Sequence, residues 1–293
     1  MALNIATFKK RAATAAVFVI VMLAGMLWNY WSFFILFSII HFGCWIEYQK
    51  LVCLIDPGYA AISPFHKYGV MLAGWCMLLY FTNDAFSIFG IQLHAIGWWL
   101  GLIAVFVLPI SELLFAKHLE LKNIGHSVFG LLYISLSLAL LIDMRCYGMI
   151  KKGANSYTDF FGFILPLGIL VALWINDTMA YLVGSFIGKT PFSKISPKKT
   201  WEGTIGGGIL CIAVVGIMGW SIHRYTIKDW IAIAAIVAVF GVLGDLLESK
   251  LKRMAGVKDS GSIMPGHGGF LDRFDSLLLA APFVWLYVFL FMK

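Results

Sequence analysis

The chain has 293 residues, of which 61% are hydrophobic, 16% aromatic and 13% charged, and its mean hydropathy is +0.88. Soluble globular proteins are closer to half apolar and a quarter charged, so this composition excludes a single water-soluble domain. The formal net charge of +7 comes from basic residues between apolar runs. That distribution is typical of the loops that orient membrane proteins, and it does not indicate nucleic-acid binding.

Nine apolar runs follow one another, each close to the ~20 residues that a helix needs to cross a ~30 Å hydrocarbon core. Backbone groups in lipid must bond within the chain, so the runs predict an all-α polytopic membrane protein with about nine transmembrane helices. The expected spans are 12–28, 31–47, 67–82, 93–111, 127–142, a sixth from near 160 past Asp177, 204–222, 229–244 and 270–291. Residues 1–150 hold about five spans, and residues 151–293 form the expected catalytic region.

The distribution of Lys and Arg predicts the orientation, because nine spans place the termini on opposite sides. A cytoplasmic N-terminus puts 16 Lys and Arg residues on the cytoplasmic side and 6 on the other. Without loops 176–203 and 245–272 and the adjoining Arg273 the split is 7 to 6, so these two loops carry most of the bias. Two spans separate the loops, so they share one side, and we expect a polar active site facing the cytoplasm. The short N-terminus favours a bacterial inner (plasma) membrane over an organelle.

Loop 176–203 carries polar residues that membrane spanning does not require. Asp177 follows a mostly apolar run, and a carboxylate at the edge of a span is costly enough to be a functional candidate; the alternative is a solvated helix cap. Gly184, Gly188 and Lys189 imitate a nucleotide P-loop, but only three residues separate the glycines and the context is a membrane span, which excludes that motif. The five cysteines show no CxxC pairing, so neither a disulfide nor a zinc framework is expected.

The end of the same loop, Ser193–Gly203, combines lysines and hydroxyls before an apolar run. Pro197 ends any helix, and Thr200 is a candidate N-cap for the next one. A helix N-terminus flanked by lysines suits an anion, although a basic loop without a ligand explains the pattern equally well.

The most polar stretch, 244–276, holds 10 charged residues in 33 positions. Asp245, Glu248, Ser249 and Lys252 are spaced by three or four and therefore share one face of a helix. Asp272 and Asp275 repeat this spacing at the start of the last run. Carboxylates at two helix ends can hold a hard divalent cation through oxygen ligands.

Between these carboxylates lies His267, surrounded by Gly266, Gly268 and Gly269. Glycines let backbone N–H groups come close to a bound ligand. Solvated loop charges explain the stretch poorly, because Asp245 and Asp272 border apolar spans where solvation is poor.

Residues 249–275 resemble the signature of the phosphatidate cytidylyltransferase (CDP-diacylglycerol synthase) family. The family pattern is S-x-apolar-K-R-x4-K-D-x-small-x2-apolar-P-x-H-G-G-apolar-x-D-R-apolar-D, and every polar position is present here at that spacing. Met264 replaces the usual Leu, Ile or Phe, which keeps volume and polarity. The upstream SPKKT-x-EG of 196–203 also matches. The resemblance covers about the last 120 residues closely, and residues 1–150 only as a hydrophobic bundle.

The resemblance implies the reaction of CTP with phosphatidate to CDP-diacylglycerol and pyrophosphate at a lipid bilayer, and it leaves a homodimer open. It implies Mg²⁺ as cofactor, bound by Asp245 and Asp272, with Asp275 completing a second cation position. Residues expected to carry catalysis are Lys252, Arg253, Lys258, His267 and Arg273. Residues expected to bind substrate or phosphate are Asp177, Ser196, Lys198, Lys199, Thr200, Ser249, Gly268 and Gly269. A general base is not required, because phosphomonoesters have a second pKa of about 6; His267 then binds phosphate or shapes the loop.

Two other functions stay open. A CTP-dependent polyprenol or lipid kinase would share a related nucleotide region but transfer the γ-phosphate, and the complete HGG-x-x-D-R-x-D sequence favours the cytidylyltransferase. A transporter would place polar residues in discontinuous spans near the membrane midplane, often in inverted repeats. No internal repeat is evident, and the charges gather on one side.

Overall fold

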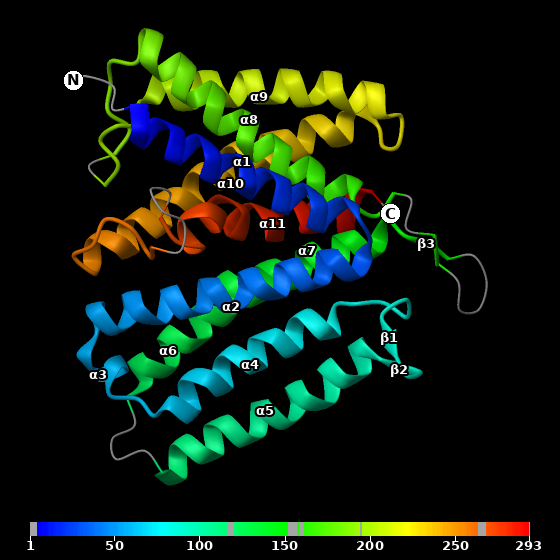
Figure 1. Cartoon of the computed structure of the whole chain (residues 1–293), viewed down its shortest axis with the longest axis vertical. Helices are drawn as coiled ribbons and strands as arrows, with labels where there is room; N and C mark the ends of the chain where they lie inside the picture. The colour runs from blue at the N-terminus through cyan, green and yellow to red at the C-terminus, as the bar shows by residue number, and fades with distance from the viewer. Residues whose placement is uncertain are drawn as a thin grey trace. The chain divides into compact units, whose positions relative to one another are not determined.

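The computed structural model describes residues 5–115, 120–151, 157–158, 161–193, 195–262 and 268–292. Its elements in chain order are α1 (Ile5–Leu27), α2 (Tyr30–Ile55), α3 (Pro57–Ala60), α4 (Pro64–Tyr80), β1 (Ser87–Ile88), β2 (Ile91–Gln92), α5 (Leu93–Phe115), α6 (Leu121–Gly130), the π-helical turn η1 (Leu131–Leu136), α7 (Ser137–Tyr147), β3 (Ile150–Lys151), β4 (Tyr157–Thr158), α8 (Ile164–Ile187), α9 (Trp201–Ile222), α10 (Ile227–Met254) and α11 (Leu271–Phe291). The four strands form two short antiparallel hairpins, β1–β2 and β3–β4. The helical fold class expected from the sequence is confirmed (Figure 1).

Seven helices of the described residues are long and apolar enough to cross a membrane, with α6, η1 and α7 counted as one continuous helix, Leu121–Tyr147. The expected first span falls on α1, whose apolar part Ala13–Leu27 is shorter, and the third falls on α4, which has 17 residues. The count of nine therefore stays a prediction.

Two helices extend further into the polar loops than the apolar runs indicate. The run 229–244 predicts a helix end near Asp245, but α10 continues to Met254, so Asp245 lies inside the helix. The sixth span was expected to pass Asp177, and α8 does so and continues to Ile187, so the first part of loop 176–203 is helical. An apolar run indicates only how much of a helix lies in lipid. The helix can continue beyond it where polar side chains support it, as the pair of Glu248 with Lys252 does four positions apart.

Local capping accounts for the starts of several helices. Asn29 and Ser32 form a reciprocal capping box at α2, with the Asn29 Oδ1 accepting from the Ser32 N–H at 2.8 Å. Ser63 caps α4, which has Pro64 in its first turn, where a missing N–H costs nothing. Thr200 caps α9 by accepting from the Gly203 N–H at 3.1 Å, as expected.

The chain divides into two compact parts, 1–163 with 254–273, and 164–253 with 274–293. The boundary at residue 150 that the sequence suggested is of another kind, because it separates the N-terminal spans from the expected catalytic region. It stays a prediction. In the first part, α2 packs on α4 and on the continuous helix from α6 to α7, and α4 packs on α5 (Figure 1). Its core contains the fully buried aromatic side chains of Phe33, Phe37 and Trp45.

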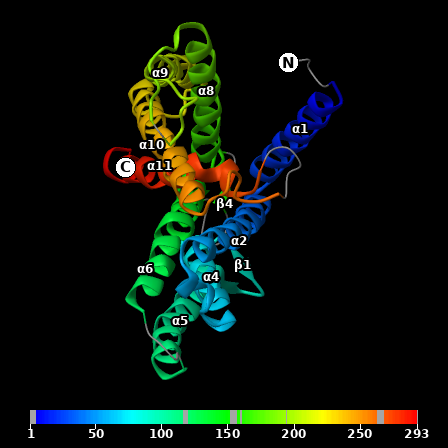
Figure 2. The same cartoon turned by 90° about the vertical axis from the view of Figure 1, so that its left-hand side faces the viewer.

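In the second part, α8 and α9 pack closely along small residues (Figure 2). A Cβ atom on Gly207 would lie 2.5 Å from the Ala180 backbone nitrogen, and one on Gly203 would lie 2.7 Å from the Ala180 oxygen. Trp230 of α10 fills the space beside Gly168 and Gly219. Small residues at such contacts let helix backbones approach each other in a membrane, where lipid gives no hydrophobic drive between helices.

Candidate active site

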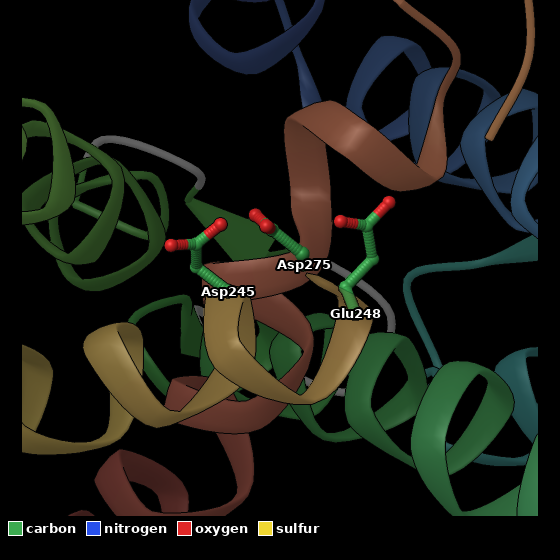
Figure 3. A group of neighbouring side chains, drawn as sticks. All are labelled: Asp245, Glu248 and Asp275. Carbon is green, nitrogen blue, oxygen red and sulfur yellow. The ribbon is translucent and has the colours of Figure 1, made fainter. Parts of the chain in front are cut away.

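Three carboxylates from two helices meet in the second part of the chain. Asp245 and Glu248 lie one turn apart on α10, Asp275 lies on α11, and their ligand oxygens are all within 4.8 Å of one another (Figure 3). Gly244 permits this approach, because a Cβ atom there would lie 2.5 Å from the Asp275 backbone oxygen. The close contact of the two helices therefore brings the carboxylates together.

The carboxylate cluster, defined as Asp245, Glu248 and Asp275, is poorly solvated and accompanied by lysines. Glu248 is fully buried and Asp275 is 7% exposed. Lys252 Nζ lies 2.5 Å from Glu248 Oε2, and Lys199 pairs with Asp245. Buried charges require such partners, because removing them from water costs several kcal/mol per ion.

The loop before α9 brings Lys199 to this cluster. The Glu202 carboxylate accepts from the backbone N–H groups of Lys189 and Thr190 at 3.1–3.2 Å. The Lys199 carbonyl accepts from the Phe192 N–H at 2.7 Å, which folds the loop back on itself. Asp177 of α8 interacts electrostatically with Lys199 and Asp245. Asp177, Lys199 and Asp245, which were expected from two separate loops, are thus brought together.

Residues 254–273 of the signature belong to the first part of the chain. Asp272 Oδ2 accepts from the Ser260 N–H at 2.9 Å, the Ser260 hydroxyl at 2.9 Å and the Gly269 N–H at 2.8 Å. Gly268 has φ +83°, a conformation that favours glycine. Asp272 is therefore tied to the turn that leads into α11, and its role as a metal ligand stays a prediction.

Other expected residues lie at the surface of their parts. Lys198, Arg253, Lys258 and Arg273 are exposed, whereas Ser196 and Ser249 are half-buried. The Ser196 carbonyl accepts from the Lys199 N–H at 3.1 Å and so helps to shape the loop. His267 lies outside the described residues, as do Met264 and Pro265 of the signature.

Three residues of these arrangements were missed as site residues. Glu248 shares the helix face of Asp245 in the sequence, so its spacing could have placed it among the ligands. Glu47 of α2 accepts hydrogen bonds from Ser260, Phe270 and Leu271. Its signal was a single carboxylate at the end of an apolar run, which is a functional candidate by default. Ser260 occupies an unspecified position of the signature and gave no signal.

Comparison with known proteins identifies the family. The model of the cytidylyltransferase family matches residues 9–291. The chain is 34% identical over 206 residues to phosphatidate cytidylyltransferase of Haemophilus influenzae, covering 67% of each chain. It is 34% identical over 224 residues to that of Bacillus subtilis, covering 75% of this chain and 77% of the relative.

A third relative is phosphatidate cytidylyltransferase 5, chloroplastic, of Arabidopsis thaliana, 33% identical over 200 residues, which are 63% of this chain and 50% of the relative. The chain thus spans about half the length of the chloroplast relatives. The family match itself extends over nearly the whole chain. This protein belongs to the cytidylyltransferase family.

Proposed function

We propose that this protein transfers CMP from CTP to phosphatidate and so makes CDP-diacylglycerol and pyrophosphate. A phosphate oxygen of phosphatidate bonds to the α-phosphorus of CTP, and the bond from that phosphorus to the bridging oxygen of the β-phosphate breaks. The names of the relatives support this reaction. The observation that carries it is the carboxylate cluster with Lys199 and Lys252 beside it.

The donor set of the cluster fits Mg²⁺. Its oxygens come from three carboxylates close enough to share one ion, and two of the three side chains are buried. Mg²⁺ prefers oxygen ligands and commonly binds through one or two carboxylates together with substrate phosphates. When bound, it would offset the negative charge that grows on the phosphate oxygens. We include Asp272 and a second cation in this proposal on the strength of the family resemblance.

The lysines of the cluster are the groups best suited to bind phosphate. Lys199 lies directly before Thr200, the N-cap of α9, so an anion beside it would also meet the positive end of that helix. Lys252 lies on the same face of α10 as Glu248 and is mostly buried. A lysine in such a setting interacts with phosphate more strongly than an exposed one, because the surroundings screen its charge less.

We further propose that the site faces the cytoplasm of an inner (plasma) membrane, based on the 16 to 6 distribution of Lys and Arg. A cysteine introduced at the exposed position of Lys198 provides the test. It should react with a membrane-impermeant thiol reagent only after intact cells are opened. Reaction in intact cells would reverse the orientation.

The reaction is tested with the purified protein, phosphatidate vesicles, Mg²⁺ and CTP labelled at either the α- or the γ-phosphate. The expected result is α-label in lipid and γ-label in pyrophosphate, with CTP preferred over ATP and GTP. Transfer of γ-label to lipid would show a CTP-dependent lipid kinase. If the protein binds CTP but forms neither labelled lipid nor labelled pyrophosphate, the proposed reaction is refuted and a transporter becomes the better explanation.

A further inference from the structure

Glu47 is a buried carboxylate that the proposed reaction does not use directly. It is the single acidic residue of α2 and is 1% exposed. Burying a carboxylate is strongly unfavourable unless hydrogen bonds replace those it made to water. An ionisable residue within a candidate membrane span is a functional candidate for that reason.

Three donors from the signature segment satisfy Glu47. Oε1 accepts from the Phe270 N–H at 3.0 Å, and Oε2 accepts from the Leu271 N–H at 2.9 Å and the Ser260 hydroxyl at 2.7 Å. Both ends of the segment 260–271 are therefore bound to one side chain. The first residue of α11 is among them, so Glu47 also satisfies N–H groups that a helix start leaves without partners.

The neighbouring glycines leave the space that the Glu47 carboxylate occupies. A Cβ atom on Gly261 would overlap Glu47 Oε1, and one on Gly269 would overlap both carboxylate oxygens. A side chain at either glycine would collide with Glu47. The family signature requires a small residue at 261 and glycine at 269, and Glu47 supplies a physical reason for both.

Ser260 joins Glu47 to Asp272. Its Oγ lies 2.7 Å from Glu47 Oε2 and 2.9 Å from Asp272 Oδ2, and it also accepts from the Asp272 N–H at 3.3 Å. A hydroxyl has one hydrogen, so the two carboxylates share it. Without Glu47 the hydrogen would go to Asp272 alone, which withdraws negative charge from that carboxylate, and the Phe270 and Leu271 N–H groups would be released.

We infer that Glu47 is a positioning residue that holds Asp272 for cation binding through Ser260 and the start of α11. The inference rests on the proposed function, in which Asp272 is a metal ligand. Helix capping alone does not explain Glu47, because Asp272 already binds the Gly269 N–H in that turn and a neutral side chain would cap at a lower desolvation cost. Hydrogen-bond partners of metal ligands commonly contribute about 10- to 100-fold to metal affinity or activity.

The test compares E47A, S260A and the double variant in the full-length protein in lipid nanodiscs. Mn²⁺ binding is measured by electron paramagnetic resonance without nucleotide, and amide hydrogen exchange is followed over 268–275. We expect E47A to raise the Mn²⁺ Kd by about 10-fold or more and to lower kcat similarly, with the KM for CTP within about twofold. Exchange should rise at Phe270 and Leu271 in the metal-free protein.

S260A should raise the Mn²⁺ Kd by about 3-fold or more, and the double variant should resemble E47A, because without Glu47 the hydroxyl still contacts Asp272 but no longer connects it to α2. E112Q is the matched control, because Glu112 is another carboxylate of the first part and pairs with His66 at 3.1 Å. The Mn²⁺ Kd of the E112Q variant should equal that of the wild type. If E47A does not fold, S260A decides, since it removes only a hydroxyl. Wild-type Mn²⁺ affinity in E47A or in S260A, or simple multiplication of the two effects, would overturn the inference. Wild-type pyrophosphate release tests the proposed function separately.

Discussion

Gly244 connects helix packing to the carboxylate cluster, and its substitution by alanine tests that connection. The new Cβ would lie 2.5 Å from the Asp275 backbone oxygen and 3.0 Å from the Ser276 Cα, where ordinary contact begins at 3.4 Å. Both neighbours are backbone atoms, which cannot rotate away as a side chain can. Relief therefore requires α10 and α11 to separate by about 0.9 Å at this point.

That separation should reduce activity more than stability. Overpacking of this kind costs about 1–3 kcal/mol in a well-packed core. A displacement near 1 Å between catalytic groups can cost about 100-fold in rate, and here it would move Asp275 away from Asp245 and Glu248. We expect G244A to lower kcat by about 10- to 100-fold and to raise the Mg²⁺ concentration for half-maximal activity, with a melting temperature only a few degrees lower.

The assay is initial-rate pyrophosphate release over a Mg²⁺ series, together with thermal unfolding of the same preparations. G241A is the control, since it lies one turn earlier on α10. Its Cβ would lie 2.7 Å from the end of the flexible Leu173 side chain and 3.8 Å from the Ser276 Cβ, so a rotamer change relieves it. Wild-type kinetics in G244A, or equal damage in G241A, would refute the reasoning.

Three further predictions concern charged groups. D245N should lower pyrophosphate release by about 100-fold or more and weaken Mn²⁺ binding, because it removes a cluster carboxylate; near-normal turnover at saturating Mg²⁺ would exclude it as a ligand. K199M should tighten Mn²⁺ binding without nucleotide, because Asp245 loses its counter-ion, yet raise the KM for CTP. The ion pair with Lys122 at 2.9 Å holds the pKa of Asp56 below its ordinary value. Its contribution to stability is therefore present above about pH 4 and lost as pH falls through the lower folded value, so the drop in melting temperature caused by D56N should be largest at pH 7 and should shrink as the pH is lowered below about 4.

The helices were largely predictable because apolar runs near membrane length leave few alternatives. The ends of the helices could not be predicted from composition. In α10, the residues from Asp245 to Met254 are polar enough to suggest a loop, yet they continue the helix and place Asp245 and Glu248 on one face. The spacing was visible in the sequence, whereas the continuation of the helix was not, because an apolar run marks only the length of helix that lipid requires.

Part of the site could also be predicted. Asp245 was expected to bind Mg²⁺ together with Asp272, and Asp275 to complete a second cation position. The structure places Asp245 and Asp275 in one cluster with Glu248, and the pairing of Asp245 with Asp272 stays a prediction. Glu47 could not be paired with its partners, because it binds the Leu271 N–H across 224 positions of sequence. No local pattern encodes a contact of that range, and only the packing of the first part of the chain shows which segment a lone carboxylate serves.

The two lysines beside the carboxylate cluster balance part of its negative charge. When all three are ionised, Asp245, Glu248 and Asp275 carry three negative charges in a poorly solvated position, and Lys199 and Lys252 offset two of them. A divalent cation would bring the group to a net positive charge, and the lysines could then exchange carboxylate oxygens for phosphate oxygens without uncovering an unpaired buried charge. Lys199 is better placed for this exchange, because its side chain is 31% exposed against 12% for Lys252. The same two lysines therefore stabilise the cluster before substrate binds and are available to the triphosphate afterwards, which is why K199M should affect metal and nucleotide binding in opposite directions.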